Sequence, residues 1–301
     1  MTIRFDNRVA IVTGAGAGLG REHAIGLAAR GAKVVVNDYG PSGASAIAEE
    51  TVALIRAAGG EAFAHGADVS NAEQVGDMMA RAIADWGSVD ILVNNAGILR
   101  DRAFAKMTMA DWDAVVRVHL TGAFVCTMAA WPHMKAAGYG RIVMTSSSSG
   151  IYGNFGQSNY GAAKMAVIGL MNVLHIEGAK HNIRVNTLAP GAATQMTRDL
   201  LPAPVIALMD AKTVTPGLLY LVSEDAPSRT ILCATAGGFS RTFIVETEGI
   251  HLDVDNCTPE QVAARWEAIS DLTVQHHYES GGPQVMKFVG KAAAAAGIEL
   301  G

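Results

Sequence analysis

Two short apolar runs near the start of the chain are joined by a glycine cluster and a helical pattern. The runs, 8–13 (RVAIVT) and 33–37 (KVVVN), are rich in β-branched residues, which favour strands. Between them, residues 19–30 have the apolar spacing of a helix, which Gly31 ends. A strand, a helix and a second strand of these lengths form a βαβ unit, and its two strands run parallel. No other part of the sequence constrains the fold as strongly.

The same alternation continues through most of the chain. Further strand patterns occur at 61–66, 90–93, 141–146, 183–188 and 230–235. Helical patterns separate them at 43–58, 71–85, 109–136 and 158–181, and a loop with a helix covers 192–224. Strands that alternate with helices of this length predict a parallel sheet covered on both faces. We therefore expect an α/β protein with a doubly wound, Rossmann-type sheet.

The alternation stops near residue 237. Residues 243–252 are expected to form a hairpin or an extended arm, and Thr258-Pro259 starts a helix that runs to about residue 272. Residues 238–301 are too few to bury a core of their own. The sequence thus predicts one domain over 1–237 and a C-terminal extension over 238–301, which packs on that domain or on a partner subunit.

The composition excludes several classes of protein. The 301 residues carry a net charge of −5 with acids and bases interspersed, so the basic patch of a nucleic-acid-binding protein is missing. The three cysteines are far apart and form no C-x-x-C pair, which argues against a metal site or a disulfide framework. The sequence has no signal-peptide pattern and no apolar run of about 18 residues. We expect a cytoplasmic protein with neither a metal nor a membrane partner.

The glycine cluster is suited to a phosphate ligand. Residues 13–20 read TGAGAGLG, directly after the first strand and at the start of a helix. Glycines permit a tight turn there and let backbone N–H groups approach a pyrophosphate at the positive end of the helix. The expected contacts with a dinucleotide come from Gly14, Gly16, Gly18, Leu19 and Gly20.

Asp38 indicates which dinucleotide is bound. It follows the second strand, where a carboxylate hydrogen-bonds the ribose hydroxyls of NAD. The same carboxylate would repel the additional phosphate of NADP, and neither Ala17 nor Tyr39 is a basic residue that could neutralise it. A solvated aspartate at a strand end is the alternative interpretation. The expected cofactor is NAD, which makes 1–237 the NAD-binding domain.

Ser147, Tyr160 and Lys164 form the candidate catalytic group. Ser147 follows an apolar strand, and Lys164 lies four residues after Tyr160 near the start of a helix, so the phenol and the ammonium share one helical face. A free phenol ionises near pH ~10. A neighbouring ammonium would lower that pKa, so that the pair could exchange a proton with an alcohol or ketone. A surface tyrosine beside a solvated lysine is the alternative that this pair alone leaves open.

Together these motifs resemble one protein family. The chain carries, in order, TGAGAGLG, Asp68-Val69, Asn94-Asn95-Ala96-Gly97, Ser147, Tyr160-x-x-x-Lys164 and Pro190-Gly191. This ordered set is similar to that of the short-chain dehydrogenase/reductase family, over about residues 5–237. The resemblance implies that Tyr160 is the general acid/base, that Lys164 lowers its pKa and holds the nicotinamide ribose, and that Ser147 binds the substrate oxygen.

The resemblance also implies further cofactor contacts. Asp68 and Val69 would flank the adenine, Asn95, Ala96 and Gly97 would lie beneath the adenosine, and Pro190 and Gly191 would line the nicotinamide pocket. The family usually has an asparagine, which anchors a water in a proton relay to the lysine, where this chain has His119. Histidine both donates and accepts hydrogen bonds, so His119 is a candidate for the same relay, with a packed helix histidine as the alternative.

Within the family the match can be narrowed. GAGAGLGR, NNAGILRDRAF, VHL and MTSSSSGIYGNFGQSNY resemble the (3R)-hydroxyacyl-CoA dehydrogenase part of the type 2 peroxisomal multifunctional enzymes. This implies NAD-dependent oxidation of a (3R)-hydroxyacyl-CoA with a fatty acyl or steroid side chain. The alternatives are a 17β-hydroxysteroid dehydrogenase, a 3-oxoacyl carrier-protein-type ketoreductase and, outside enzymes, a non-catalytic dinucleotide-binding regulator.

The resemblance implies a homodimer or homotetramer, because family members pair through the long helices at 109–136 and 158–181.

Candidate substrate contacts are less specific. Arg100 and Arg102 could hold the phosphates of CoA, or they could be solvated loop residues. The segment 192–213 is apolar enough to cover a long substrate through Met196, Leu200, Leu201, Val205 and Ile206, although ordinary packing produces the same composition.

Overall fold

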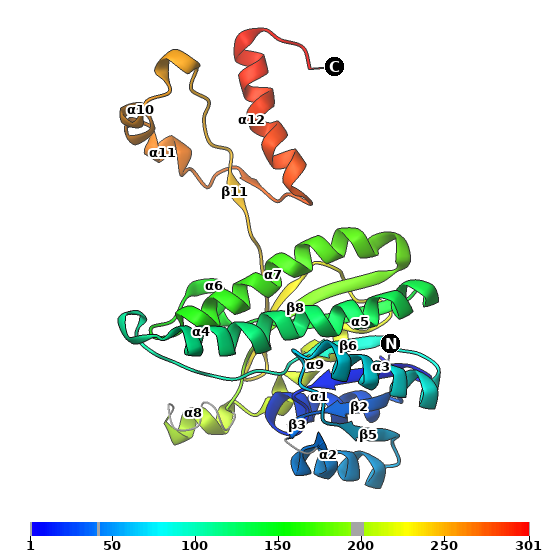
Figure 1. Ribbon diagram of the computed structural model, residues 1–301. Helices are drawn as coiled ribbons and strands as arrows, with labels where there is room; N and C mark the ends of the chain where they lie inside the picture. Colours follow the sequence, from blue (N-terminus) through cyan, green and yellow to red (C-terminus); the bar gives the residue numbers. More distant parts are fainter. Residues whose placement is uncertain (1, 41–42, 194–201, 301) are drawn as a thin grey trace. The chain divides into compact units, whose positions relative to one another are not determined.

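An eight-stranded sheet forms the centre of the segment Met1–Thr242 in the computed structural model, which describes residues 2–40, 43–193 and 202–300 (Figure 1). The strands lie in the order β10-β9-β8-β7-β6-β1-β2-β5, and all neighbours run parallel except β9 and β10. They are β1 (Val9–Thr13), β2 (Lys33–Asn37), β5 (Ala62–His65), β6 (Ile91–Asn94), β7 (Gly140–Thr145), β8 (Ile183–Gly191), β9 (Ile231–Thr235) and β10 (Gly238–Thr242). The predicted doubly wound α/β fold is confirmed.

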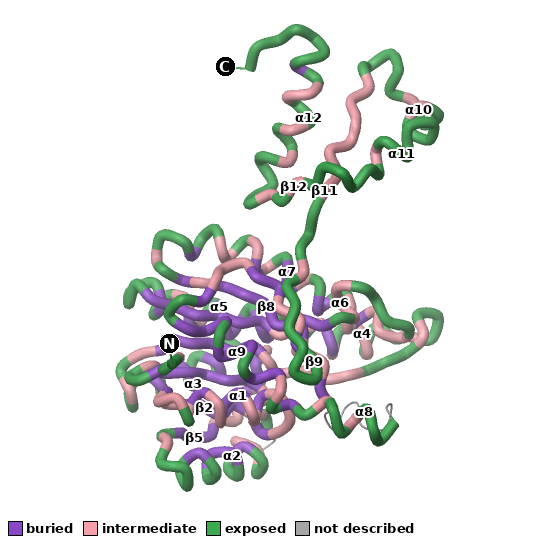
Figure 2. Tube along the Cα trace, turned by 180° about the vertical axis from the view of Figure 1, so that it is seen from behind, coloured by how far each residue is buried: buried purple, intermediate pink, exposed green. Residues whose placement is uncertain are grey.

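Helices cover both faces of this sheet. One face packs against α1 (Gly18–Ala28), α2 (Ala46–Ala57) and α9 (Thr215–Leu221), and the other against α3 (Ala72–Trp86), α5 (Gly122–Ala137) and α7 (Ser158–Gly178). Alternate residues of β1 therefore enter opposite cores: Ala10 and Val12 enter the first, and Val9 and Ile11 the second. Figure 2 shows the strands buried between exposed helical surfaces. This double burial explains why the strands read as continuous apolar runs.

The helical run from 109 to 136 is divided by a π-helical turn. Helix α4 (Met109–Val116) and helix α5 are joined by η2 (Arg117–Thr121), where the sequence pattern predicted one continuous helix. Such turns often occur at functional sites, and this one carries His119. The whole run Met109–Ala137 is long and apolar enough to cross a membrane by length and composition, and 44% of its most apolar window is buried. A single helix of this kind is weak evidence for a membrane span, because the core helix of a globular domain passes the same test.

The start of the second helix also differs from the prediction. Residues Gly43–Ala44 (β4) were expected to be helical, but they pair with Tyr39–Gly40 (β3), and α2 begins after Ser45. The hydroxyl of Ser45 accepts a hydrogen bond from the backbone N–H of Ala48, which satisfies a free donor at the helix start. Gly43 has a φ of +129°, which a helix does not contain.

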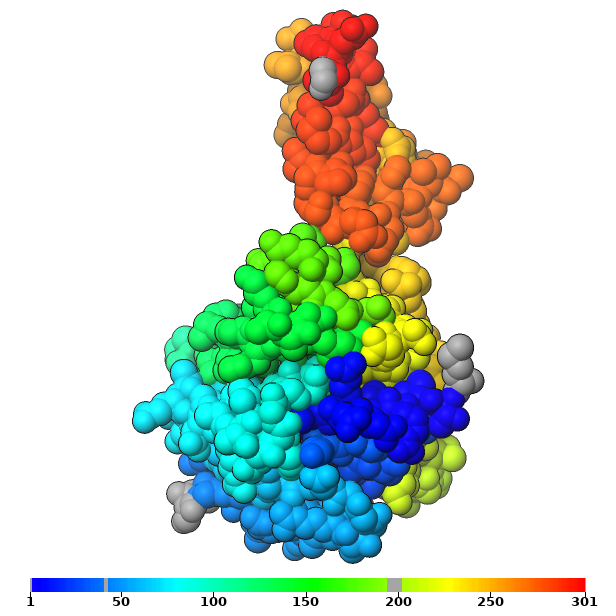
Figure 3. Space-filling model, turned by 90° about the vertical axis from the view of Figure 1, so that its right-hand side faces the viewer, coloured from blue at the N-terminus to red at the C-terminus, as the bar shows by residue number. Residues whose placement is uncertain are grey.

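Polar contacts join distant segments at the amino edge of the sheet. Arg8 lies within 3.3 Å of the carboxylates of Asp90 and Glu224. Figure 3 shows the dark-blue N-terminal residues beside the yellow segment around Glu224. Arg141 of β7 is fully buried and donates to the backbone oxygens of Ser223 and Glu224. These contacts fix the amino ends of β1 and β7, so the carboxyl ends are held in register for a site.

The compact units divide after Thr242, because β10 still belongs to the main sheet. The expected boundary at residue 237 therefore falls before the last strand. The second unit, Phe243–Gly301, contains β11 (Glu246–Thr247), β12 (Gln275–His276), α10 (Pro259–Ala264), α11 (Trp266–Ile269) and α12 (Gly281–Ala296). The helix expected to run to about residue 272 is thus broken between α10 and α11, and the arm of 243–252 contributes β11, whose partner is β12.

The second unit has little apolar interior. Among its described residues only Ala293 is buried. Ion pairs hold it together instead, with Lys287 on Glu246 and Lys291 on Glu248 joining α12 to β11 and the residue after it. Its packing on a domain or on a partner subunit remains a prediction.

Candidate active site

The glycine loop lies at the carboxyl end of β1 and leaves no room for side chains. A Cβ at Gly14, where φ is +64°, would lie 2.8 Å from the Cα of Ala96. A Cβ at Gly20 would lie 2.2 Å from the carbonyl oxygen of Gly14. Separations under 3 Å do not occur for real Cβ atoms, so the turn requires glycine at both positions.

Helix α1 begins directly after this turn with unsatisfied N–H groups. Its N-cap residue, Ala17, provides no side-chain cap, and its first turn contains no acidic residue. The positive end of the helix dipole therefore favours an anion there. Loop and helix terminus together fit the pyrophosphate of a dinucleotide. Leu19 differs from its neighbours, because its side chain packs against the core beneath α1.

Asp38 is fixed beside the glycine loop. Its Oδ2 accepts a hydrogen bond from the N–H of Gly16 at 2.9 Å, and its Oδ1 accepts one from the hydroxyl of Ser45 at 3.0 Å. Arg21, the first basic residue after the loop, donates to the carbonyl oxygen of Gly16 and to Thr51. An oriented carboxylate therefore lies beside the glycine loop, while the neighbouring guanidinium is already hydrogen-bonded.

Thr13 ties the end of β6 to the end of β1. The backbone N–H groups of Asn95 and Ala96 both donate to the hydroxyl of Thr13 at 3.0 Å, and the amide of Asn95 donates to the Thr13 carbonyl at 2.9 Å. The sheet order reverses direction between these two strands, which is where open α/β sheets bind ligands. The Asn94–Gly97 segment thus braces the carboxyl ends of these two strands.

The remaining expected cofactor contacts lie along the same edge. Asp68 accepts hydrogen bonds from the N–H and hydroxyl of Ser70. Val69 packs against Gly122, where a side chain would not fit, because a Cβ on Gly122 would lie 2.6 Å from a methyl group of Val69. Pro190 and Gly191 end β8. Of the residues expected to cover a substrate, Val205 and Ile206 lie on α8 (Ala203–Leu208). The others, Met196, Leu200 and Leu201, lie outside the described residues.

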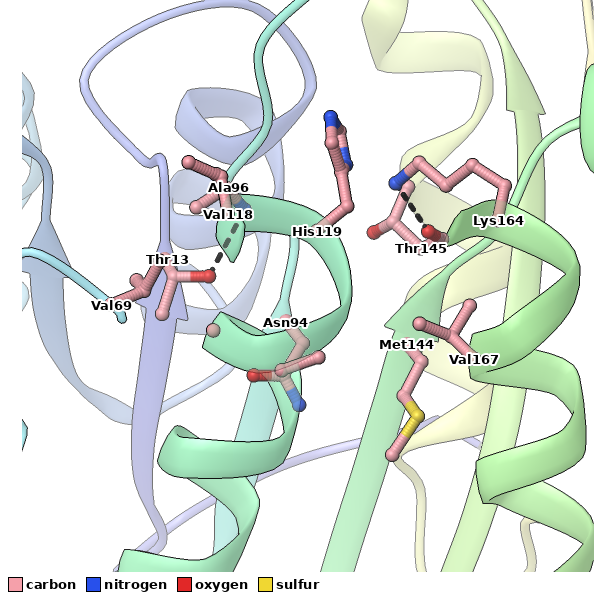
Figure 4. A pocket seen from close by; sticks show the side chains of 12 residues that line it. Thr13, Val69, Asn94, Ala96, Val118, His119, Met144, Thr145, Lys164 and Val167 are labelled. Carbon is pink, nitrogen blue, oxygen red and sulfur yellow. Dashed lines mark hydrogen bonds between the residues drawn. The ribbon is translucent and has the colours of Figure 1, made fainter. Parts of the chain in front are cut away.

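Ser147, Tyr160 and Lys164 come together at the carboxyl end of β7. Ser147 caps the short helix α6 (Ser148–Tyr152) and hydrogen-bonds Tyr160. Tyr160 and Lys164 lie on the first turns of α7, with the Lys164 Nζ 5.5 Å from the centroid of the phenol ring. Lys164 is only 3% exposed, and its ammonium donates to the carbonyl oxygen of Thr145 at 2.5 Å (Figure 4). The buried lysine excludes the interpretation as a solvated surface pair.

Burial shifts the pKa of both groups so that the neutral phenol and the neutral amine are favoured. It raises the pKa of Tyr160 above its ordinary value, with Asp101 adding to the rise and the hydrogen bond with Ser147 opposing it. Burial lowers the pKa of Lys164 to about 7. The sequence predicted a tyrosine pKa lowered by the lysine. Burial instead raises it, because the phenolate is the charged form and is the one that desolvation disfavours.

His119 occupies the π-helical turn and is only 5% exposed. Its Nε2 lies 2.8 Å from the carbonyl oxygen and 3.0 Å from the backbone nitrogen of Ile98. Its ring meets that of Tyr160 edge-on, with 5.1 Å between the centroids. Gly97 makes room for it, because a Cβ there would lie 2.3 Å from Cε1 of His119. The histidine is therefore packed into the site beside the expected acid/base.

The sequence analysis did not identify Asn159, which is fully buried directly before Tyr160. Its amide donates to the backbone oxygens of Arg100 and Asp111 at 3.0 and 3.2 Å, and its Oδ1 accepts from the N–H of Tyr160 at 2.8 Å. It fixes the start of α7 against the loop after β6. The sequence offered one indication of this role, an asparagine in the first turn of the helix that carries Tyr160. Arg100 itself remains exposed, as does Arg102.

The sequence of this chain is similar to those of known dehydrogenases. The family model described as short chain dehydrogenase matches residues 8–204. A putative short-chain type dehydrogenase/reductase of Mycobacterium tuberculosis is 45% identical over 89% of this chain and 95% of its own length. Peroxisomal multifunctional enzyme type 2 of Mus musculus is 46% identical over 90% of this chain, which spans only 38% of that enzyme.

A solved structure extends the comparison to a bound state. A 7α-hydroxysteroid dehydrogenase complexed with NADH and 7-oxo glycochenodeoxycholic acid superimposes with a TM-score of 0.71 and 31% identity, over 78% of this chain and 95% of that one. The match shows that a chain of this fold holds a nicotinamide dinucleotide together with a ketone.

Two buried histidines predict how stability depends on pH. Burial lowers the pKa of His23 and of His119 to about 3. In the unfolded chain histidine titrates near pH ~6.5, so between these values the unfolded state binds more protons and acid favours unfolding. Acidification from pH 6 to 5 should therefore cost His23→Gln about 1.2 kcal/mol less unfolding free energy than it costs the unaltered protein.

Chemical denaturation at a series of pH values from 7 to 5 measures how the unfolding free energy falls with pH. Most carboxylates titrate below this range, so they contribute little to the fall. His133→Gln, which replaces an exposed histidine of α5, is the control and should leave the pH dependence unchanged. An equal pH dependence in His23→Gln and the unaltered protein would contradict the prediction.

Proposed function

This chain belongs to the short-chain dehydrogenase family, and we propose that it oxidises a (3R)-hydroxyacyl-CoA to the 3-oxoacyl-CoA with NAD. As a member of that family it is an oxidoreductase that acts on CH–OH groups and uses a nicotinamide dinucleotide. The observation that carries the proposal is the cluster of Ser147, Tyr160 and buried Lys164 beside the glycine loop, at one edge of the sheet.

In the proposed reaction each of these side chains has a part. The substrate hydroxyl lies between Ser147, which orients its oxygen, and Tyr160, which accepts its proton as the phenolate. Lys164 in its ammonium form stabilises that phenolate and is itself held by the Thr145 carbonyl. The nicotinamide ring supplies the hydride acceptor when the cofactor is bound. In the reverse direction the neutral phenol donates its proton to the oxygen formed from the ketone.

Asp38 supports NAD over NADP. Its carboxylate is oriented by Gly16 and Ser45 at the place where the ribose of a dinucleotide would lie over the glycine loop. A 2′-phosphate there would meet a like charge. The guanidinium of Arg21 donates to Gly16 and Thr51 instead of facing that position.

The multifunctional-enzyme relatives support the acyl-CoA substrate. The similarity to the mouse enzyme covers 90% of this chain, well beyond the residues that the family model matches. The chain spans less than half of that enzyme, so an activity of the whole enzyme transfers only as a proposal. A steroid alcohol is the second candidate, because the bile-acid enzyme with the same fold holds a steroid ketone beside NADH.

The test is reduction of NAD and NADP by the purified protein with three alcohols in parallel: a (3R)-hydroxyacyl-CoA, its 3S epimer and a hydroxysteroid. We expect NADH formation with the 3R thioester alone and a kcat/KM for NADP lower by about 100-fold or more. Turnover of the steroid without the thioester would replace the proposed substrate. No turnover with any of the three would contradict the proposal.

Asp38→Ser provides the matched test of the cofactor. It removes the carboxylate but keeps a hydroxyl that can still bond the loop. We expect kcat/KM with NAD to fall and that with NADP to rise, since the repulsion of the phosphate disappears. Ser45→Ala keeps the carboxylate and should retain the preference for NAD. An unchanged ratio of the two cofactors in Asp38→Ser would contradict the role of Asp38.

We also propose that two copies pair through α5 and α7. Enzymes of this family are commonly oligomeric, and these helices form an apolar groove of about 290 Å³, lined by Phe124, Met128, Trp131, Leu170 and Leu174 among others. Val173 and Ile176 of α7 add two half-exposed apolar side chains. A second copy that presents the same helices would cover these surfaces, as an isologous contact requires.

Light scattering after size exclusion tests this pairing. The unaltered protein should have the mass of a dimer or tetramer, and Val173→Glu should lower it, because the charge would be buried without a partner. Leu54→Glu is the control, since Leu54 of α2 has the same exposed fraction, 52%, as Val173. The prediction is contradicted if Val173→Glu keeps the mass of the unaltered protein.

A further inference from the structure

Asn159 is a fully buried polar side chain to which the proposed reaction gives no part. Its Nδ2 donates to the carbonyl oxygen of Arg100, in the loop after β6, at 3.0 Å and to that of Asp111, on α4, at 3.2 Å. Its Oδ1 accepts a hydrogen bond from the N–H of Tyr160 at 2.8 Å. One side chain thus joins the expected acid/base to a loop and a helix that are 59 and 48 residues away in the chain.

Two further hydrogen bonds hold the same loop beside the start of α7. The backbone N–H of Arg102 donates to the carbonyl oxygen of Gly156 at 2.8 Å. The side-chain amide of Gln157 donates to Oδ2 of Asp101 at 2.8 Å. Together with the bond from Asn159 to the loop, these two form what we call the loop clamp. It holds three consecutive residues of the loop against the segment that directly precedes the tyrosine.

An asparagine meets the requirements of this position. Its amide has two N–H donors and an oxygen that accepts, and both donors and the oxygen are used here. The N–H of Tyr160 lies in the first turn of α7, where the helix itself provides no acceptor. Alanine would remove the partner of that buried N–H, and aspartate would place a second oxygen against two carbonyl oxygens. The start of the helix that carries the phenol therefore depends on this amide.

The groups that face the Tyr160 phenol come from four segments. Lys164 lies one turn further along α7, His119 meets the ring edge-on from the π-helical turn, and Ser147 hydrogen-bonds the phenol from the end of β7. Asp101 acts from the clamped loop. Burial raises the pKa of Tyr160, and the negative charge of Asp101 raises it further, because that charge disfavours the phenolate. How strongly Asp101 acts on the phenol depends on where the loop is held.

We propose that Asn159 is a positioning residue, which fixes the Tyr160 phenol relative to the loop that carries Asp101. This inference rests on the proposed function, since it gives Asn159 a part in the same site. The amide acts through the tyrosine and the loop, makes or breaks no covalent bond and transfers no proton. Without it, the first turn of α7 and the loop are free to move against each other, so that the phenol is displaced from the substrate hydroxyl.

Asn159→Ala is the test, and Asn186→Ala is its matched control. Asn186 of β8 is equally buried, donates to the backbone carbonyls of Leu221 and Pro227, and accepts from the N–H of Thr230. These partners are not among the expected site residues. We expect kcat for alcohol oxidation to fall by about 100-fold in Asn159→Ala, because a displacement of about 1 Å is enough for that loss. NADH affinity should stay within a few-fold. Asn186→Ala should lower the thermal unfolding midpoint but keep kcat within a few-fold.

The pH dependence separates positioning from a loss of stability. Asp101→Asn removes the charge and keeps an acceptor for Gln157, so the phenolate should form at lower pH and the acidic limb of kcat/KM for oxidation should move down. Because the carboxylate is exposed and screened by salt, we expect a shift of about 0.3–0.5 pH unit. Asn159→Ala should move the limb in the same direction by at least as much, since it releases the loop. Asn186→Ala should leave the limb in place.

A kcat of Asn159→Ala that falls no further than that of Asn186→Ala would overturn the proposal. A limb that stays within about 0.2 pH unit of the unaltered protein would also overturn it, since that result describes a purely structural role. If Asn159→Ala does not fold, Gln157→Leu decides. It removes the exposed bond to Asp101 and should move the limb down as Asp101→Asn does, and an unmoved limb would then overturn the proposal.

A second readout needs no substrate. In the protein with ¹³C-labelled tyrosine, NMR follows the ionisation of Tyr160, whose signal is identified by its absence in Tyr160→Phe. The midpoint of this ionisation should be lower in Asn159→Ala and in Asp101→Asn than in the unaltered protein, and unchanged in Asn186→Ala. Unchanged midpoints in both variants would overturn the inference. The expected midpoints without turnover of any alcohol would support it and would locate the failure in the proposed function.

Discussion

The site depends on a lysine ammonium buried at the carboxyl edge of a parallel sheet. Burying such a charge is unfavourable unless it is hydrogen-bonded, and burial lowers the pKa of Lys164 to about 7. The carbonyl of Thr145 compensates part of that cost at the last residue of β7. The ammonium nitrogen lies 5.5 Å from the centroid of the Tyr160 ring. Burying the lysine lowers the stability of the fold, and it also gives the site a group whose pKa is close to neutral pH.

The remainder of the fold brings the cofactor loop to the same edge. The direction of winding changes between β1 and β6, and Thr13 joins the ends of these two strands through its hydroxyl. On one side of that junction lies the glycine turn with Asp38, and on the other lies Gly97 against His119. Because the amino edge is tied by Arg8 and Arg141, this geometry is supported from the opposite end of the sheet.

Much of this arrangement was predictable from the sequence, for physical reasons. The strands read as apolar runs because both faces of the sheet are covered, and the glycines mark positions where a Cβ cannot fit. The four-residue spacing of Tyr160 and Lys164 correctly predicted a shared helical face. Local patterns were sufficient for these features because each depends on residues close together in the chain.

Features that depend on tertiary contacts were missed. The π-helical turn at 117–121 has no distinct apolar period, and its effect is visible only where His119 meets Ile98. The rise in the pKa of Tyr160 could not be predicted from its neighbour in sequence, because it results from burial by several elements. The helix α12 was not anticipated either, since an alanine run does not reveal the ion pairs that hold it.

The central claim is that Tyr160 is the acid/base of a site which binds the dinucleotide independently of it. Tyr160→Phe tests this claim most directly, with NADH binding measured by fluorescence and alcohol oxidation measured in parallel. The account predicts that NADH still binds with an affinity within a few-fold of the unaltered protein, while kcat falls by about 1,000-fold or more. A variant that binds NADH and retains its turnover would contradict the account.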